Sequence, residues 1–141
     1  MNMNMDHVGI VVSDLDSAIK FWVDILDFKV VERFDRSGKD IDRLQGIPSV
    51  DFHVVKMLDS SGAVVELLHY RGTVGAAEKQ RLCDCGIRHL AFSVDDVRAY
   101  YDLLVQNGCE VISEPVEDQP FLIFFVRDPD GNLIEFMGKN G

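Results

Sequence analysis

The sequence has few basic residues, few cysteines and no long hydrophobic run, and each shortage argues against a class of function. Fourteen lysines and arginines stand against 24 aspartates and glutamates, which gives a formal net charge of −10 at pH 7. Such a surface repels nucleic acid and anionic membranes, so neither is an expected partner. An anionic small molecule would have to be drawn by local positive charge.

The hydrophobic pattern and the cysteine content predict a soluble, cytoplasmic protein. No apolar stretch approaches the roughly 20 residues that a membrane-spanning helix needs. The first five residues, MNMNM, lack the basic region and the apolar core of a signal peptide. Three cysteines cannot all pair in disulfides, which favours a reducing compartment.

An internal repeat is the most informative feature of the sequence. Residues 7–15 (HVGIVVSDL) align with residues 89–97 (HLAFSVDDV) at an offset of 82. Residues 59–67 (DSSGAVVEL) align with residues 128–136 (DPDGNLIEF) at an offset of 69. The first half therefore carries 13 extra residues, which we place within residues 33–50.

Each half shows the same order of expected elements. Residues 5–12 and 87–94 alternate like strands, and each strand is followed by helix N-cap signals and an apolar helical pattern. Asp27 and Gly108 are suited to end the two helices in a left-handed conformation. A strand follows each helix, at residues 29–34 and 110–113, and two further strands join through turns at residues 60–62 and 129–132.

These elements predict an α+β fold of two tandem βαβββ modules. We expect one domain over residues 1–141, with a first module at 5–70, a linker at 71–86 and a second module at 87–138. Each half of about 70 residues would be marginally stable alone, so the halves should pack on each other or on a second chain.

The strand alternation places the two repeated histidines on equivalent faces. His7 shares its face with Gly9 and Val11, while His89 shares its face with Ala91 and Ser93. Small neighbours beside each imidazole leave room for a ligand.

Two glutamates complete a pattern that is typical of a metal site. Glu66 and Glu135 each lie within an apolar strand, where a carboxylate is costly to bury unless it is paired or coordinates a metal. Together with His7 and His89 they predict a site for one divalent ion. Imidazole and carboxylate ligands suit Ni, Co, Zn, Mn or Fe, and ligand type does not choose among them.

The sequence resembles a known superfamily. The paired His and Glu, the segment DPDGNLIEF at 128–136 and the repeated strand order are similar to the vicinal oxygen chelate superfamily. That superfamily includes glyoxalase I, methylmalonyl-CoA epimerase, extradiol dioxygenases, and bleomycin- or fosfomycin-resistance proteins. The resemblance covers nearly the whole chain.

The resemblance implies both a shape and a chemistry. It implies cup-shaped mixed sheets around one metal ion held by His7, Glu66, His89 and Glu135, often in a homodimer, with the ligands coming from one chain or from two. A divalent ion would act as a Lewis acid on a small carbonyl or thioester substrate and stabilise an enediolate. The resemblance points to Glu135 as the catalytic base, with Glu66 as its counterpart.

The residues leave several members of the superfamily open. Glyoxalase I resembles the four-ligand pattern, yet its two glutathione contacts, an Arg and an Asn, correspond here to Val11 and Tyr70. The segment ELLH at 66–69 resembles methylmalonyl-CoA epimerase, whereas Arg88 replaces the first residue of that family's His-His pair. We expect a glyoxalase I-like or epimerase-like lyase or isomerase. The alternatives are an extradiol-type dioxygenase and a metal-free antibiotic-binding protein.

Other residues have ordinary explanations beside functional ones. Cys83 and Cys85 could ligate a metal, but two thiols without a second pair are more typical of free cysteines. His53 and His69 have no counterpart in the other half, which favours a surface or interface role. Three basic residues of the insertion either hold a substrate carboxylate or phosphate or lie in a solvated loop: Arg36, Lys39 and Arg43. Four aromatic side chains either line the mouth of the cup or belong to the core: Phe34, Phe52, Phe121 and Phe124.

Overall fold

The computed structural model describes residues 1–72, 75 and 78–140. The chain divides into two compact units, Met1–Ala76 and Ala77–Gly141. Each unit is a mixed sheet with one helix between its first two strands, so the α+β class and the repeated strand and helix order are confirmed. Within the described residues, no helix has the length and hydropathy to cross a membrane.

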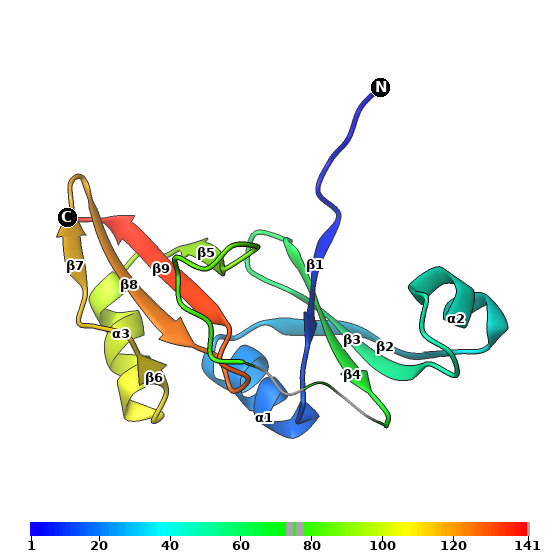
Figure 1. The fold of residues 1–141 in the computed structure, drawn as a ribbon. Coiled ribbons are helices and arrows are strands. Elements are labelled where there is room, and N and C mark those ends of the chain that lie inside the picture. The colour runs from blue at the N-terminus through cyan, green and yellow to red at the C-terminus, as the bar shows by residue number, and fades with distance from the viewer. Residues whose placement is uncertain (73–74, 76–77, 141) are drawn as a thin grey trace. The chain divides into compact units, whose positions relative to one another are not determined.

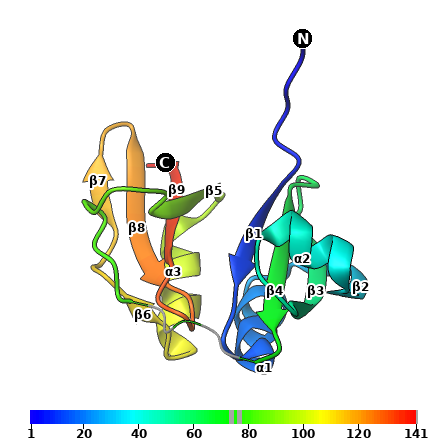
Figure 2. The ribbon, with the colours of Figure 1, turned by 45° about the vertical axis from the view of Figure 1, so that its right-hand side comes forward.

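The first unit contains a four-stranded sheet in the order β1-β4-β3-β2 (Figure 1). Its elements are β1 (His7–Val11), α1 (Leu15–Ile19), the π-helix η1 (Lys20–Ile25), β2 (Lys29–Ser37), α2 (Lys39–Gln45), β3 (Asp51–Leu58) and β4 (Val64–Tyr70). Strand β1 runs parallel to β4, and the other neighbours are antiparallel. Helices α1 and α2 lie on opposite faces of this sheet (Figure 2).

The second unit repeats this order with a five-stranded sheet. Its elements are β5 (His89–Ser93), α3 (Val97–Gln106), β6 (Glu110–Val111), β7 (Val116–Asp118), β8 (Phe121–Arg127) and β9 (Leu133–Lys139). The order is β5-β9-β8-β6, and β7 also pairs with β8. Strand β5 runs parallel to β9, as β1 does to β4.

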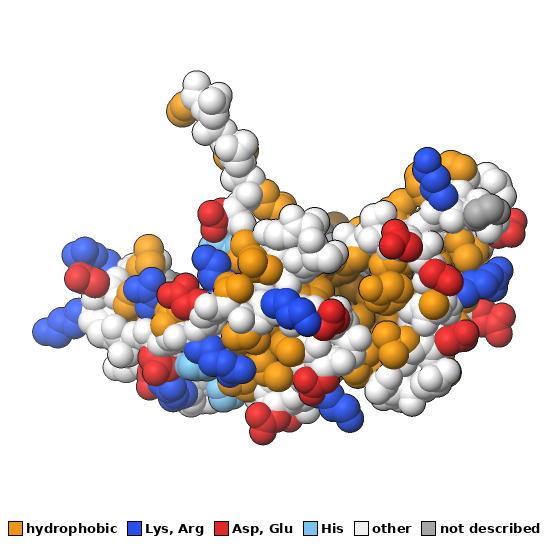
Figure 3. Space-filling model, turned by 180° about the vertical axis from the view of Figure 1, so that it is seen from behind, with side chains coloured by type: hydrophobic (Ala, Val, Ile, Leu, Met, Phe, Trp, Pro, Cys, Tyr) orange, Lys and Arg blue, Asp and Glu red, His pale blue; other side chains and the backbone are white. Residues whose placement is uncertain are grey.

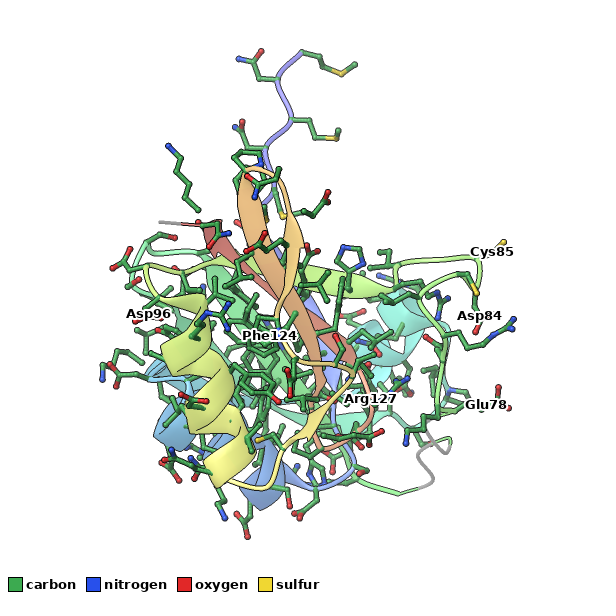
Figure 4. All side chains as sticks on the ribbon, turned by 90° about the vertical axis from the view of Figure 1, so that its left-hand side faces the viewer. Glu78, Asp84, Cys85, Asp96, Phe124 and Arg127 are labelled. Atoms are coloured by element: carbon green, nitrogen blue, oxygen red, sulfur yellow. The ribbon has the colours of Figure 1, made fainter. Side chains whose placement is uncertain are left out.

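The helix ends follow the sequence signals. The Asp14 carboxylate accepts a hydrogen bond from the Asp16 N–H at 3.3 Å, and the Asp96 carboxylate accepts one from the Ala99 N–H at 3.0 Å (Figure 4). Asp27, with φ of 61°, and Gly108, with φ of 73°, adopt the expected left-handed conformation. Both predicted N-caps and both predicted helix ends are confirmed.

The core of each unit lies between its sheet and its first helix. In the first unit Trp22 is fully buried and meets Phe28 edge to face, with ring centroids 5.2 Å apart. In the second unit Phe124 lies between β8 and α3 (Figure 4), where it stacks on Phe136 at 5.2 Å and meets Tyr101 at 5.5 Å. The opposite face of each sheet carries the repeated His and Glu.

The insertion of the first half differs from a solvated loop. Residues 39–45 form α2, and Ile41 packs against the buried cluster of Val50, Phe52 and Val54. The Tyr70 hydroxyl donates to Gln45 Oε1 at 2.7 Å and ties α2 to β4. An apolar contact and a hydrogen bond therefore give this segment a fixed place on the sheet.

The strand after the second helix also differs from its prediction. Residues 110–113 were expected to form a strand, but β6 ends at Val111, and a second short strand, β7, begins at Val116. Pro115 precedes β7 and has no backbone N–H to donate to a neighbouring strand. The predicted strand therefore ends two residues early, and β7 is an additional strand that the sequence did not indicate.

Candidate metal centre

In the first unit, sheet pairing brings His7 and Glu66 together. Glu66 on β4 lies directly across from Gly9 on β1, and His7 is the next residue on the same face of β1. Gly9 has no side chain to cover the carboxylate, so Glu66 reaches the imidazole. His7 Nε2 lies 3.4 Å from Glu66 Oε2, and the two side chains are 42% and 14% exposed.

The second unit repeats this arrangement with His89 and Glu135. Glu135 on β9 lies across from Ala91 on β5, and the methyl group of Ala91 is small enough to leave the path to His89 open. His89 Nε2 lies 3.1 Å from Glu135 Oε2, and the exposed fractions are again 42% and 14%. Each unit therefore presents the same pair on the same kind of face.

The atom separations suit two ligands of one metal ion. With bonds of about 2.1 Å and angles between about 90° and 109°, two ligand atoms on an ion lie roughly 3.0 to 3.4 Å apart. The His–Glu separations in both units fall in that range. Within either unit, the described residues gather no more than two such ligands at one point, since no group of three or more occurs.

The two histidines are oriented by different neighbours. His7 Nδ1 lies 2.7 Å from Asp6 Oδ1, and this hydrogen bond is the first cause of the lowered pKa of Asp6. A carboxylate on Nδ1 is the usual partner of a metal-ligating imidazole, because it directs Nε2 toward the ion. Asp6 belongs to the exposed segment that leads into β1 (Figure 3). The His89 ring instead meets Phe125 edge to face at 5.5 Å.

The hollows beside the two glutamates differ in polarity. The hollow at Glu66 has a volume of about 480 Å³, and its lining is mostly charged: Glu32, Phe34, Asp35, Arg36, Lys56 and Glu66. The hollow at Glu135 has a volume of about 450 Å³, and its lining is mostly apolar: Ser113, Val116, Asp118, Ile123, Phe124, Phe125 and Glu135. The repeat therefore conserves the ligand pair but not its surroundings.

Lys56 is a residue of this site that the repeat did not indicate. It lies directly across from Glu66 on β3, on the face that carries the ligand pair. The equivalent position of the second unit, across from Glu135, is Phe125. A search for matched residues passes over a lysine that has no counterpart. The alternating pattern of residues 51–58 was the signal that could have placed Lys56 on this face of a strand.

The positions expected to contact glutathione are used differently here. The Tyr70 hydroxyl is occupied by its bond to Gln45 of α2. Val11 is 46% exposed and has no polar group to donate.

His53 and His69 lie away from the ligand pair. They face each other across β3 and β4 on the opposite side of the sheet from Glu66. His53 Nδ1 lies 2.9 Å from Asp35 Oδ1, and Arg71 donates to the same oxygen. These contacts with His53 and then Arg71 lower the pKa of Asp35.

The remaining candidates separate into core and surface. Phe52 and Phe124 are buried, Phe34 and Phe121 are half-buried, and Phe34 lines the hollow at Glu66. Cys83 and Cys85 are free, exposed thiols (Figure 4 labels Cys85). Lys39 and Arg43 are exposed on α2, and Arg43 pairs with Asp40 at 3.4 Å.

Comparison with known proteins decides the family. A sequence model described as the Glyoxalase/Bleomycin resistance protein/Dioxygenase superfamily matches residues 4–136. The chain belongs to this superfamily. The resemblance to vicinal oxygen chelate proteins that the sequence motifs indicated is thereby confirmed.

Individual relatives agree with that assignment. The chain is 32% identical over 136 residues to a probable lactoylglutathione lyase of Synechocystis, covering 93% of this chain and 92% of that protein. A glyoxalase family protein of Bacillus cereus has a TM-score of 0.89 at 24% identity, over 100% of this chain and 97% of its own. The fosfomycin resistance protein FosX of Listeria monocytogenes, solved with Mn(II) and sulfate, has a TM-score of 0.66 at 16% identity, over 99% and 95%.

Proposed function

We propose that the two His–Glu pairs together bind one divalent metal ion and that the protein is a glyoxalase I-like lyase or isomerase. Its substrate in this proposal is a small molecule with a carbonyl or thioester group. The proposal leaves open whether the pairs that share an ion come from one chain or from two chains of a homodimer. The metal is Ni, Co, Zn, Mn or Fe.

The matched geometry of the pairs is the observation that carries this proposal. A lone His beside a Glu is an ordinary surface contact, but here two sheets present the same pair with the same exposed fractions. Relatives named lactoylglutathione lyase and a structural neighbour solved with Mn(II) support the same chemistry. Four protein ligands would leave open positions on an ion that accepts six.

The ion, when bound, polarises a substrate carbonyl and stabilises the negative charge that develops as the adjacent carbon loses its proton. A side chain must accept that proton within hydrogen-bond reach. We assign this role to Glu135, with Glu66 as its counterpart. Apolar side chains surround Glu135, whereas Glu66 has Lys56 beside it. On this difference in surroundings we assign Glu66 as a permanent ligand and proton transfer to Glu135.

We further propose a cytoplasmic homodimer. Cys83 and Cys85 are free thiols, which suits a reducing compartment. Dimers are common in the superfamily, and pairing of chains would supply the additional packing surface that units of this size need.

Proton exchange tests the proposed chemistry without knowledge of the product. The metal-loaded protein is incubated in D₂O with a panel of hemithioacetals of 2-oxoaldehydes, made with glutathione and with smaller thiols, and with acyl thioesters. Deuterium incorporation next to the carbonyl is then followed by NMR. We expect exchange or isomerisation of at least one class with metal and none after the metal is removed.

Matched variants separate the two glutamates. Glu135→Gln should lower exchange by at least about a hundredfold, as loss of a general base does. Glu66→Gln should lower metal affinity as well, and His53→Ala on the opposite face should change neither property. Full metal occupancy and full turnover in Glu135→Gln would show that the base assignment is wrong. Tight ligand binding without metal would favour a metal-free binding protein over a lyase. Oxygen consumption with Fe(II) would favour an extradiol-type dioxygenase.

A further inference from the structure

The hollow beside Glu66 carries a lysine that pairs with no carboxylate in the part of the chain that the structure describes. Lys56 is half-buried on β3, and its Cα lies across from both Glu66 and Glu32. Lys56 nevertheless forms no ion pair with a described carboxylate. A half-buried ammonium that faces an open hollow is a strong, compact donor for an anionic ligand.

Lys56 lies next to the ligand pair. It stands directly across from Glu66, on the sheet face that also carries His7. An anion bound next to Lys56 would lie beside the candidate metal ligands.

A second cation lines the same hollow. The Arg36 guanidinium lies over the ring of Phe34, 5.2 Å from its centroid. This contact keeps the guanidinium along the sheet face while its N–H groups remain free to donate. Arg36 forms no ion pair with a described carboxylate.

The acidic groups of the hollow do not cancel these two cations. Asp35 is occupied by His53 and Arg71. Glu66 would be compensated by the ion it is proposed to hold. With the ion in place, Glu32 would be the one remaining uncompensated carboxylate among the described residues that line the hollow, and the hollow would carry net positive charge in a chain of net charge −10.

We propose that Lys56, with Arg36 at the rim, binds an anionic oxygen group of the substrate, a carboxylate or a phosphate. The hollow at Glu135 has no basic side chain among its described lining residues, so this charge is particular to the Glu66 side. This inference rests on the proposed function, because it assigns the charged end of the substrate to the Glu66 side of that site. It predicts a preference for anionic over neutral carbonyl compounds.

Three small ketones test this preference by NMR titration of the full-length protein. The probes are 4-oxopentanoate, hydroxyacetone phosphate and the neutral 4-oxopentanamide, each added to zinc-loaded and to metal-free protein at low salt. At least one anion should bind roughly tenfold tighter than the amide, as a charge-assisted hydrogen bond requires. The tighter of the two anions identifies the group. Raising the ionic strength to about 0.5 M should reduce the preference.

Three variants assign the preference to Lys56. Lys56→Met should reduce the anion preference to less than about twofold, and Lys56→Arg should retain it because the charge is kept. Lys39→Met removes an exposed positive charge outside the hollow and should leave the preference unchanged. Equal binding of anion and amide by the unaltered protein, or a preference that survives Lys56→Met, would overturn the inference.

Zinc binding, measured separately by calorimetry, distinguishes this inference from the proposed function. If zinc binds but no anion preference is found, the inference fails and the metal proposal stands. If zinc does not bind, yet a preference is present and is lost in Lys56→Met, the anion site is supported and the metal proposal fails.

Discussion

Lys56 and Phe125 occupy equivalent positions in the two sheets, each directly across from a glutamate of the candidate metal centre. The repeat therefore preserves the His–Glu pair while changing the residue that faces it. A positive charge stands beside Glu66, and an aromatic ring stands beside Glu135. The two halves of the repeat therefore give the same ligand pair different surroundings.

The equivalent turns at Asp59 and Asp128 should respond to pH with opposite signs. Burial raises the pKa of Asp128, and hydrogen bonds from Asn132 offset only part of that effect. Burial also raises the pKa of Asp59, but hydrogen bonds from Ser61 and Ala63 outweigh it and leave the pKa below 3.8. Ionisation of Asp128 therefore lowers the free energy of unfolding as pH rises from 3.8 through the raised pKa of this carboxyl in the folded protein. Asp59 adds stability that is lost as pH falls through its lowered folded pKa.

Replacement by asparagine isolates each contribution. Asp128→Asn should gain stability relative to the unaltered protein as pH rises above 3.8. Asp59→Asn should lose stability at neutral pH, and its loss should shrink below 3.8. Urea unfolding from about pH 3 to about pH 7 measures both. The same sign of pH dependence in the two variants would contradict the burial argument.

Helix α2 should loosen when its tether is removed. Tyr70→Phe deletes the hydroxyl that donates to Gln45 and should cost about 1 kcal/mol of unfolding free energy. Hydrogen exchange of residues 39–45 should accelerate, because only Ile41 packing and the hydrogen bonds from Ser49 and Val50 to Asp42 would remain among the described attachments. Tyr101→Phe, in the second unit, is the matched control. Unchanged protection of α2 in Tyr70→Phe would show that Ile41 packing and the hydrogen bonds accepted by Asp42 hold the helix without this tether.

Phe124 should be a principal determinant of stability in the second unit. It is 1% exposed and contacts the rings of Tyr101 and Phe136. Phe124→Ala should lower the free energy of unfolding by about 3 to 5 kcal/mol because it leaves a cavity between β8 and α3. Val105→Ala, at a position that is 44% exposed, should change it by less than about 0.5 kcal/mol. A loss below about 1 kcal/mol in Phe124→Ala would mean that the rings repack.

The features that the sequence predicted correctly are those that depend on local chemistry or on the repeat. Strand alternation placed His7 beside Gly9, and short acidic side chains marked the helix starts at Asp14 and Asp96. The left-handed conformation at Asp27 was predicted from the tolerance of aspartate for positive φ. Family assignment followed from the two His–Glu segments.

The features that the sequence did not predict depend on contacts outside the repeat. Helix α2 is held by Ile41 and by Tyr70, which is distant in sequence, so its segment gave no clear local signal. Strand β6 ends before the predicted limit of residue 113, and β7 is an additional strand that pairs separately with β8. Lys56 was passed over because its counterpart is Phe125. The packing of the two modules as one domain remains a prediction.

The metal content of the protein tests the central claim most directly. Elemental analysis of protein purified without chelator or metal affinity resin gives the ions per chain for the unaltered protein, His7→Ala, His89→Ala and the control His53→Ala. We predict about one divalent ion per chain, lost in both His7→Ala and His89→Ala and kept in His53→Ala. No metal uptake when each ion is offered, or full occupancy in either ligand variant, would contradict a site built from both His–Glu pairs.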